Sequence, residues 1–293
     1  MLKTKITPMA GELARAKVNL ALHVTGQRSD GYHLLDSLVA FPSVADRVTL
    51  IRGGTDGLNI TGRFSDSLTS DSGNNLILAA RRALEQMVGR QFGPLHFELE
   101  KNLPIASGIG GGSADAAAAL RQMNAQLELG LSESELAVIG LQLGADIPVC
   151  IGSRVALMRG IGEELETVPQ LPDCSMILIN PGVSVSTIPV FKALAQKDNP
   201  PLPPLPDRWG TLDTLVAWLH QTRNDLEPAA ITVCPEIADV LASLDSVPAV
   251  KLARMSGSGA TCFGICEKGL ETEALETLKA AHPDWWVAAG SLN

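Results

Sequence analysis

The sequence has few aromatic residues, no patterned cysteines and no long apolar run, and each shortage excludes a class of protein. Aromatic residues make up 4% of the 293 residues, and Tyr32 is the one tyrosine. The five cysteines have neither zinc nor redox spacing, and the histidines have no ligand spacing, so we expect no structural metal. No run of 18 apolar residues occurs, and no signal peptide is recognisable at the N-terminus. We therefore expect a cytoplasmic protein with buried free thiols and no membrane partner.

Basic residues are also in the minority. The chain has 23 Lys and Arg against 32 Asp and Glu, a formal net charge of −9, and no basic stripe along its length. A surface that binds nucleic acid needs such a stripe, so we expect no nucleic-acid partner. Hydrophobic residues make up 45% of the chain, enough to bury the core of one large domain or two ordinary ones.

Hydrophobic spacing predicts strands and helices mixed along the chain, which is typical of an α+β fold. A shift in composition at 165–174 favours two domains, 1–165 and 166–293. A proline-rich segment at 200–206 has two interpretations, a surface connection or a ligand for a proline-reading domain. The expected strands are 12–24, 34–50, 95–100, 154–158, 176–179, 250–255 and 261–265, and the expected helices are 75–88, 114–127, 133–144, 211–221, 235–243 and 271–281.

A glycine-rich loop between a predicted strand and a predicted helix is the most informative segment. Its glycines allow positive φ angles and close approach of a ligand, and the helix behind it directs its positive end at the same place. We expect this loop to bind the phosphates of a nucleotide, with Ser113 as helix N-cap. No Gly-Lys-Ser/Thr closes the loop, and Ser113 stands where a Rossmann fingerprint needs glycine. The loop residues are Pro104, Ile105, Ala106, Ser107, Gly108, Ile109, Gly110, Gly111, Gly112, Ser113 and Ala114.

Other candidates each have a structural alternative at this stage. The turn 256–259 reads Ser-Gly-Ser-Gly, which fits a tight hairpin or a second wall of the phosphate site. Lys17 fits a strand edge or an inward charge that needs a partner. Asp146 fits the N-cap of a short helix containing Pro148, or a base that accepts a hydroxyl proton. Tyr32 fits the edge of a core or a ring that stacks on a nucleobase.

These segments together resemble the GHMP kinases nearly end to end. The resemblance rests on the glycine loop and on the following further motifs: Ala-Lys-Val-Asn-Leu at 16–20, Asp-Gly-Tyr-His at 30–33, Gly-Ala-Asp-Ile-Pro at 144–148, Arg-Gly-Ile-Gly-Glu at 159–163, Asn-Pro-Gly at 180–182 and Met-Ser-Gly-Ser-Gly at 255–259. The resemblance implies a two-domain α+β fold with the active site in the cleft between the domains. It also implies ATP as co-substrate, Mg²⁺, and phosphorylation of the 2-hydroxyl of a cytidine-diphosphate-linked methylerythritol in non-mevalonate isoprenoid biosynthesis.

The resemblance also implies a role for each site residue. Asp146 is the expected base and Lys17 its charged neighbour, and the loop 104–114 is the expected ATP-phosphate site. The family pattern has a second serine where Ala114 stands, so a metal contact would fall on Ser113. The expected substrate contacts are Asn19, Tyr32, His33, Thr187 and Phe191.

Two other functions stay open, a GHMP kinase for a smaller alcohol such as homoserine or mevalonate, and a binding protein without catalysis. Tyr32 and His33 favour the cytidine substrate, because smaller alcohols carry no base to stack on. The presence of both Lys17 and Asp146 favours an enzyme. We expect a monomer or a weak homodimer.

Overall fold

The computed structural model describes residues 11–68 and 75–292. The chain forms two compact units that no single cut in the sequence separates. Unit 1 comprises residues up to Arg15, then Ala45–Ile105 and Gly111–Gly152, and unit 2 comprises Ala16–Val44, Ala106–Gly110 and the chain from Ser153 onward. The predicted division near residue 165 stays a prediction.

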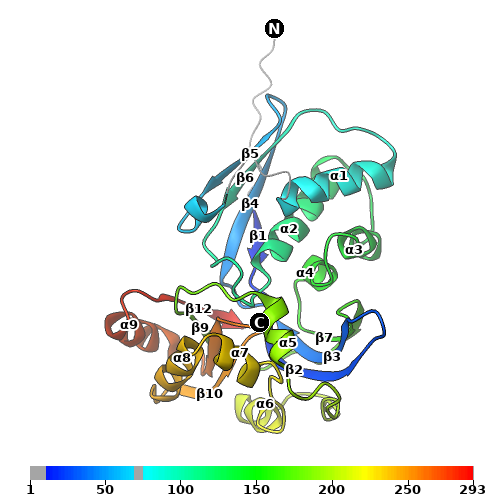
Figure 1. Ribbon diagram of the computed structural model, residues 1–293. Helices are drawn as coiled ribbons and strands as arrows, with labels where there is room; N and C mark the ends of the chain where they lie inside the picture. The colour runs from blue at the N-terminus through cyan, green and yellow to red at the C-terminus, as the bar shows by residue number, and fades with distance from the viewer. Residues whose placement is uncertain (1–10, 69–74, 293) are drawn as a thin grey trace. The chain divides into compact units, whose positions relative to one another are not determined.

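Unit 1 is a sheet covered by helices. Its strand order is β1-β4-β6-β5, with β5 and β6 parallel and the other pairs antiparallel. Helices α1 and α2 pack against each other, and α2 also contacts β1 and β4 (Figure 1). The elements of this unit are β1 (Glu12–Arg15), β4 (Ala45–Arg52), β5 (Gly57–Thr61), η1 (Ser65–Ser67), α1 (Leu76–Val88), β6 (Leu95–Glu100), α2 (Gly111–Gln126), α3 (Glu133–Leu141) and α4 (Ile147–Gly152).

The helix ends of unit 1 have clear local causes. The Asn75 side chain accepts a hydrogen bond from Ile77 N at the start of α1, and Gly89 ends that helix with φ of 71°. Ser132 and Glu135 form a capping box at the start of α3. The helix α2 is rich in alanine and buries a run of small side chains, which lets it lie close to the sheet.

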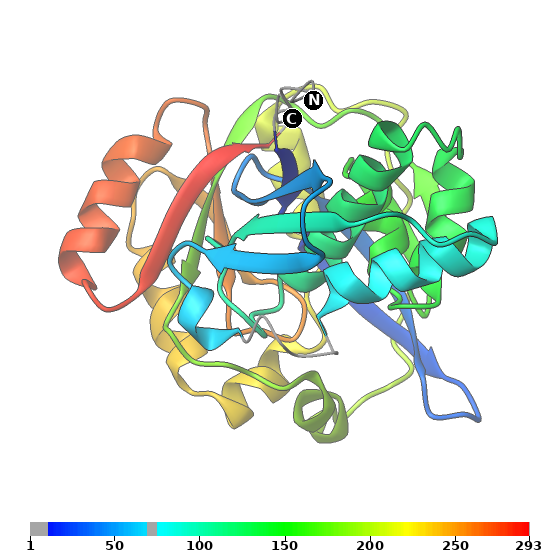
Figure 2. The ribbon, with the colours of Figure 1, turned by 90° about the horizontal axis from the view of Figure 1, so that it is seen from above.

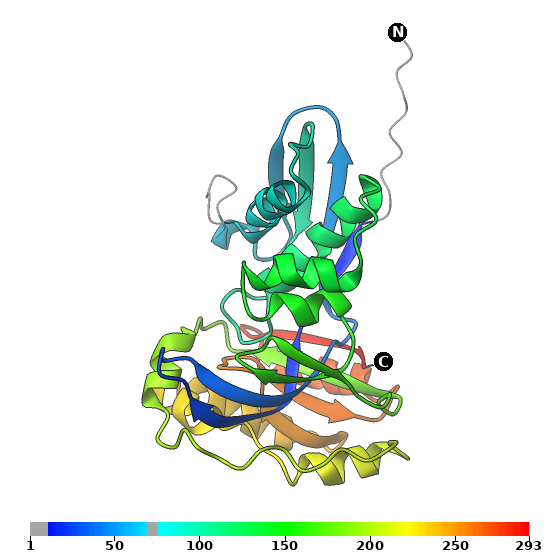
Figure 3. The ribbon, with the colours of Figure 1, turned by 90° about the vertical axis from the view of Figure 1, so that its right-hand side faces the viewer.

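Unit 2 contains two antiparallel sheets in the described residues. Their strand orders are β2-β3-β7-β8 and β10-β11-β9-β12. The β2–β3 hairpin lies beside β7 (Figure 3), and α9 flanks β12 (Figure 2). The elements are β2 (Val18–Gln27), β3 (His33–Ala40), β7 (Ala156–Gly160), β8 (Glu164–Thr167), β9 (Cys174–Asn180), α5 (Thr187–Ala193), α6 (Leu212–Leu219), α7 (Glu227–Val233), α8 (Glu236–Asp245), β10 (Val250–Met255), β11 (Cys262–Cys266), α9 (Glu271–Ala281) and β12 (Trp286–Leu292).

The core of unit 2 joins side chains that are far apart in the sequence. Leu22 and Val24 of β2 pack in one apolar cluster with Ile177 of β9, Val190 of α5 and Ile237 of α8. Cys262 and Cys266 also belong to this cluster, which confirms their predicted burial. The hairpin that carries Asn19 is thus anchored to the same core as the turn 256–259.

None of the helices in residues 11–68 and 75–292 combines the length and the apolar character that a membrane crossing requires.

Candidate active site

The first half of the glycine loop lies in unit 2, against the second glycine turn. Thr261 N donates to Ser107 O at 3.1 Å, and Ser256 Oγ donates to Gly108 O at 3.0 Å. Gly108 has φ of 79°, and a side chain at Gly257 would lie 2.7 Å from Gly108 O. Glycine is required on both sides because the two backbones touch. The turn is therefore both a tight hairpin between β10 and β11 and a support for the loop.

The second half of the glycine loop lies in unit 1 and runs into α2. That helix begins at Gly111, so Ser113 lies in its first turn, and the prediction that Ser113 is the N-cap was wrong. Backbone N–H groups at a helix start have no partner within the helix, and the helix dipole makes this end positive. Residues 111–114 therefore have the geometry of an anion site. Binding of ATP phosphates at these residues stays a prediction.

A buried charged cluster lies directly behind this helix start. Lys101 Nζ contacts Asp46 Oδ2 at 2.5 Å and Asp115 Oδ2 at 2.7 Å, and all three side chains are at most 6% exposed. Asp46 Oδ1 also accepts from Asn102 N and Leu103 N, at 2.5 and 2.8 Å. The cluster thus joins β4, the residue after β6 and the N-terminal part of α2.

The protonation of this cluster follows from its charge balance. Two carboxylates share one ammonium group, so one negative charge is left without a counter-ion. Burial, opposed by Lys101 and reinforced by Asp46, raises the pKa of Asp115 to about 7. The two carboxylates raise the pKa of Lys101 despite its burial, so that its ammonium form is retained. No motif in the sequence predicts this cluster, although a lysine directly after a predicted strand indicates a buried charge that needs a partner.

Lys17 and Asn19 come from the start of the β2 hairpin, in unit 2. Lys17 N donates to Ile109 O at 2.9 Å, and a side chain at Gly110 would lie 3.2 Å from Lys17 Cβ. Asn19 N donates to Ser256 Oγ at 3.1 Å. Lys17 and Asn19 are 4% and 1% exposed, so the strand-edge interpretation of Lys17 was wrong. Both residues therefore touch segments that the sequence assigned to the phosphate site.

An aromatic pair is found at the far end of the same hairpin. The rings of His33 and Phe191, 158 positions apart, are stacked with centroids 4.7 Å apart. His33 Nε2 is buried and has no hydrogen-bond partner. Burial, with the positive charge of Lys197 second, lowers the pKa of His33, so its ring is neutral at neutral pH. Tyr32 is 60% exposed beside it, so the core-edge interpretation of Tyr32 was wrong.

Thr187 and Asp146 complete the predicted set. Thr187 Oγ1 lies 3.0 Å from Ser258 Oγ, which links the start of α5 to the glycine turn of unit 2. Asp146 lies in unit 1, directly before α4, and its carbonyl accepts from Cys150 N at 3.3 Å. This position agrees with a helix start at Asp146, and it leaves the base assignment a prediction.

A segment outside the predicted site residues supports the glycine turn. Asn224 Nδ2 donates to Met255 O and to Gly257 O, each at 2.8 Å, and Glu227 Oε2 accepts from Met255 N at 2.9 Å. The neighbouring Asp225 accepts from Val24 N at 2.7 Å. This Asn-Asp-Leu-Glu segment therefore ties the turn to β2, and its run of polar residues before α7 was the available signal.

We expect Asn224→Ala to lower the free energy of unfolding by about 2–3 kcal/mol, because one buried and one partly buried carbonyl lose their donor. Urea unfolding followed by circular dichroism measures this change. Asn199→Ala is the matched control, since its amide also donates to a carbonyl, Val24 O, but from a partly exposed loop. Equal losses in the two variants would contradict a special role for Asn224.

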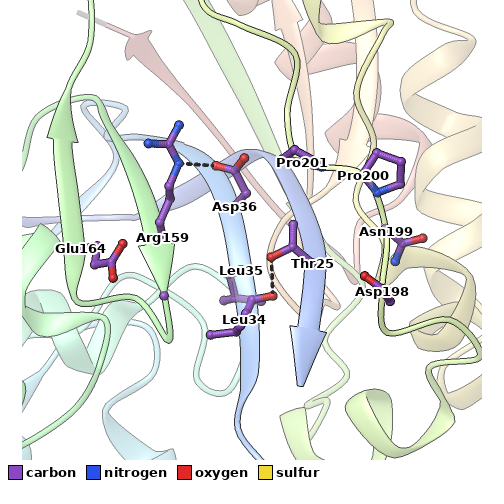
Figure 4. Close-up of a pocket in the computed structure, with 11 residues that line it drawn as sticks. Thr25, Leu34, Leu35, Asp36, Arg159, Glu164, Asp198, Asn199, Pro200 and Pro201 are labelled. Carbon is purple, nitrogen blue, oxygen red and sulfur yellow. Dashed lines mark hydrogen bonds and ion pairs between the residues drawn. The ribbon is translucent and has the colours of Figure 1, made fainter. Parts of the chain in front are cut away.

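A cavity of about 700 Å³ in unit 2 is lined by residues outside the predicted set. Figure 4 shows Arg159 of β7 directed at Asp36 on the adjacent strand β3, where Nε donates to Oδ1 at 3.1 Å. Asp36 Oδ2 also accepts from Leu202 N at 2.9 Å, and Pro200 O lies 2.9 Å from His23 Nδ1. These bonds fix the proline-rich segment on the β2–β3 hairpin, which agrees with a surface connection.

No group of three or more His, Cys, Asp or Glu side chains in the described part of the chain is arranged to hold a metal ion.

The two family models that match this chain both describe GHMP kinase domains. The model described as "GHMP kinases N terminal domain" matches residues 75–154, and "GHMP kinases C terminal" matches 192–284. A Rhizobium etli protein named 4-diphosphocytidyl-2-C-methyl-D-erythritol kinase is 51% identical over 282 residues, which cover 95% of this chain and 93% of that protein. A Cereibacter sphaeroides protein of the same name is also 51% identical, over 95% of this chain and 98% of its own.

Solved structures of kinases are similar to this chain over nearly its whole length. A crystal structure of 4-(cytidine 5'-diphospho)-2C-methyl-D-erythritol kinase has a TM-score of 0.77 and 31% identity, over 97% of this chain and 99% of that chain. A homoserine kinase from Cytophaga hutchinsonii has a TM-score of 0.71 over 100% and 98% of the two chains, but at 17% identity it shares the fold alone.

Proposed function

Because the chain belongs to the GHMP kinases, we propose that it transfers the γ-phosphate of ATP to the 2-hydroxyl of 4-diphosphocytidyl-2-C-methyl-D-erythritol. This reaction would serve non-mevalonate isoprenoid biosynthesis. The observation that carries the choice of substrate is the stacked pair of His33 and Phe191 beside the exposed ring of Tyr32. Such a group of rings suits a nucleobase, and a smaller alcohol would leave it unused. Relatives that bear this enzyme's name at 51% identity support the same choice.

Each group of predicted site residues has its own role in the proposed chemistry. The amides of the glycine loop and the positive end of α2 bind the ATP phosphates. The Asp146 carboxylate accepts the proton of the 2-hydroxyl as that oxygen bonds to the γ-phosphorus and the bond to the leaving diphosphate breaks. Lys17 supplies positive charge to the phosphoryl oxygens. The transition state of phosphoryl transfer is loose, so catalysis depends mainly on positioning of the reactants and on electrostatic stabilisation.

We propose Mg²⁺ as the ion that accompanies ATP, with the Ser113 hydroxyl as its protein ligand. Kinase sites hold Mg²⁺ through few protein groups plus substrate phosphates, so a single hydroxyl in the first turn of α2 fits this mode better than a protein cage would. The ion would neutralise charge on the transferred group.

Tyr32→Ala is expected to raise the KM for the diphosphocytidyl substrate by about 10- to 100-fold, the effect of losing one stacked base. The KM for ATP should stay within about twofold, because Tyr32 stacks on the other substrate. Steady-state kinetics with each substrate varied in turn measure both constants. Tyr32→Phe keeps the ring and serves as control, and parallel changes in both constants would refute stacking.

A coupled assay of ADP release with three alcohols tests the assignment. We expect turnover with the diphosphocytidyl alcohol and turnover at least about 100-fold lower with homoserine and mevalonate. Preference for one of the smaller alcohols would overturn the substrate, and no ADP release with any of them would favour a binding protein.

A further inference from the structure

Asn19 carries a buried acceptor that the protein leaves unused. Its side chain is 1% exposed, and its Oδ1 atom is buried without a hydrogen-bond partner. Buried polar atoms are nearly always paired, so an orphan acceptor in a native core needs an explanation. Asn19 also lies two positions after Lys17, and its backbone contacts Ser256 of the glycine turn. The orphan acceptor therefore lies on a predicted substrate contact that also touches the glycine turn.

The direction of this amide is fixed by a neighbour, Ser37. Ser37 Oγ donates to Ala21 O at 2.6 Å, and Asn19 Nδ2 donates to Ser37 Oγ at 2.8 Å. A carbonyl only accepts, so the single hydroxyl proton of Ser37 is committed to Ala21 O. Ser37 Oγ can then only accept, and the Asn19 atom that faces it must be the NH₂ group. A flipped amide would set two acceptors against each other.

Local strand geometry brings these groups together. The β2–β3 register shifts between Asn19 and Ala21, which is a bulge of one residue, and Ser37 pairs with Leu22 beyond it. Such a bulge redirects the side chain at its position. Ser37 is 0% exposed, so solvent does not compete with its hydroxyl for the Asn19 amide.

We propose that Ser37 is a positioning residue that holds the Asn19 amide so that only its oxygen is offered to the substrate. The group recognised there must be a hydrogen-bond donor, and in a polyol substrate that donor is a hydroxyl. This inference rests on the proposed function and adds to it a residue and a direction of hydrogen bonding. The relay selects against a substrate that offers only acceptors at this point, such as a ketone or an ether.

A double-mutant cycle tests the relay. Ser37→Ala should lower kcat/KM for the diphosphocytidyl alcohol by about 10- to 100-fold and change the KM for ATP by less than about twofold. In an Asn19→Ala background, the same Ser37→Ala change should alter kcat/KM by less than about twofold, because Ser37 acts through Asn19. Ser175→Ala, at another fully buried serine in a strand of unit 2, is the matched control and should leave kcat/KM unchanged.

The possible outcomes distinguish failure of the Ser37 inference from failure of the proposed function. If Ser37→Ala reduces kcat/KM by the same factor in both backgrounds, Ser37 has only a structural role and the inference is wrong. If Ser37→Ala does not fold, Ser37→Cys replaces it in the cycle, because a thiol leaves no cavity but bonds weakly. If wild-type protein does not phosphorylate the diphosphocytidyl alcohol, the proposed function fails before the cycle begins.

Discussion

Asp146→Asn is expected to lower kcat by about three orders of magnitude, within the range of general base catalysis. The amide keeps the size of the carboxylate but cannot accept the proton of the 2-hydroxyl. The dissociation constant of ATP should change little, because the loop and the helix start that bind its phosphates are untouched. Stopped-flow single-turnover kinetics and calorimetric titration with ATP measure the two quantities separately.

Asp173→Asn is the matched control for this variant. Asp173 is 70% exposed and forms a long contact, 3.5 Å, with Lys268. A surface pair of this kind contributes little, so kcat should be unchanged. Turnover of Asp146→Asn near that of the control would show that Asp146 is not the base, and its place before α4 would then be explained by helix geometry alone.

The second large effect concerns stability. Lys101→Met should lower the free energy of unfolding by about 3–5 kcal/mol, because it leaves Asp46 and Asp115 buried without a counter-ion. Asp115→Asn should cost far less, since it removes the excess negative charge and keeps the shape. Urea unfolding at neutral pH compares the two, and equal losses would contradict the charge balance given for the cluster.

The cluster also predicts how stability depends on pH. The pKa of Asp115 is raised from 3.8 to about 7 in the folded protein, so folding favours its neutral form. The stability from this group is complete below about pH 4 and is lost as the pH rises through about 7. Asp115→Asn should therefore remove a decline in the free energy of unfolding between these values. An identical pH profile in wild type and variant would contradict the raised pKa.

The sequence predicted elements well where one local signal decides the structure. The helices at 76–88 and 271–281 and the strands at 95–100 and 250–255 follow from periodicity and turn residues. The sequence predicted that the helix at 114–127 begins after the glycines, because glycine is a poor helix former. The helix begins at Gly111, which is buried. The short helix at 187–193 was missed because Pro189 interrupts its pattern.

The sequence also identified some site residues from local motifs but did not indicate their long-range partners. Motifs identified Lys17, Asn19 and His33, but their partners lie far along the chain, as Phe191 does from His33. Lys101 and Asp46 are 55 positions apart, and nothing local in either segment indicates the other. Ser37 resembles any small strand residue until its register with β2 is known. Long-range contacts of this kind depend on tertiary packing, which periodicity does not report.

The position of the transferred phosphate is the most direct test of the whole account. Carbon 2 of the proposed substrate bears a methyl group and no hydrogen, so phosphate on its hydroxyl has no three-bond coupling to a proton. The protein, ATP and 4-diphosphocytidyl-2-C-methyl-D-erythritol should yield a new phosphomonoester whose proton-coupled ³¹P signal is an unsplit line. A doublet or triplet would indicate phosphate on carbon 3 or carbon 1, and free phosphate alone would indicate ATP hydrolysis. Each of these results would contradict transfer to the 2-hydroxyl.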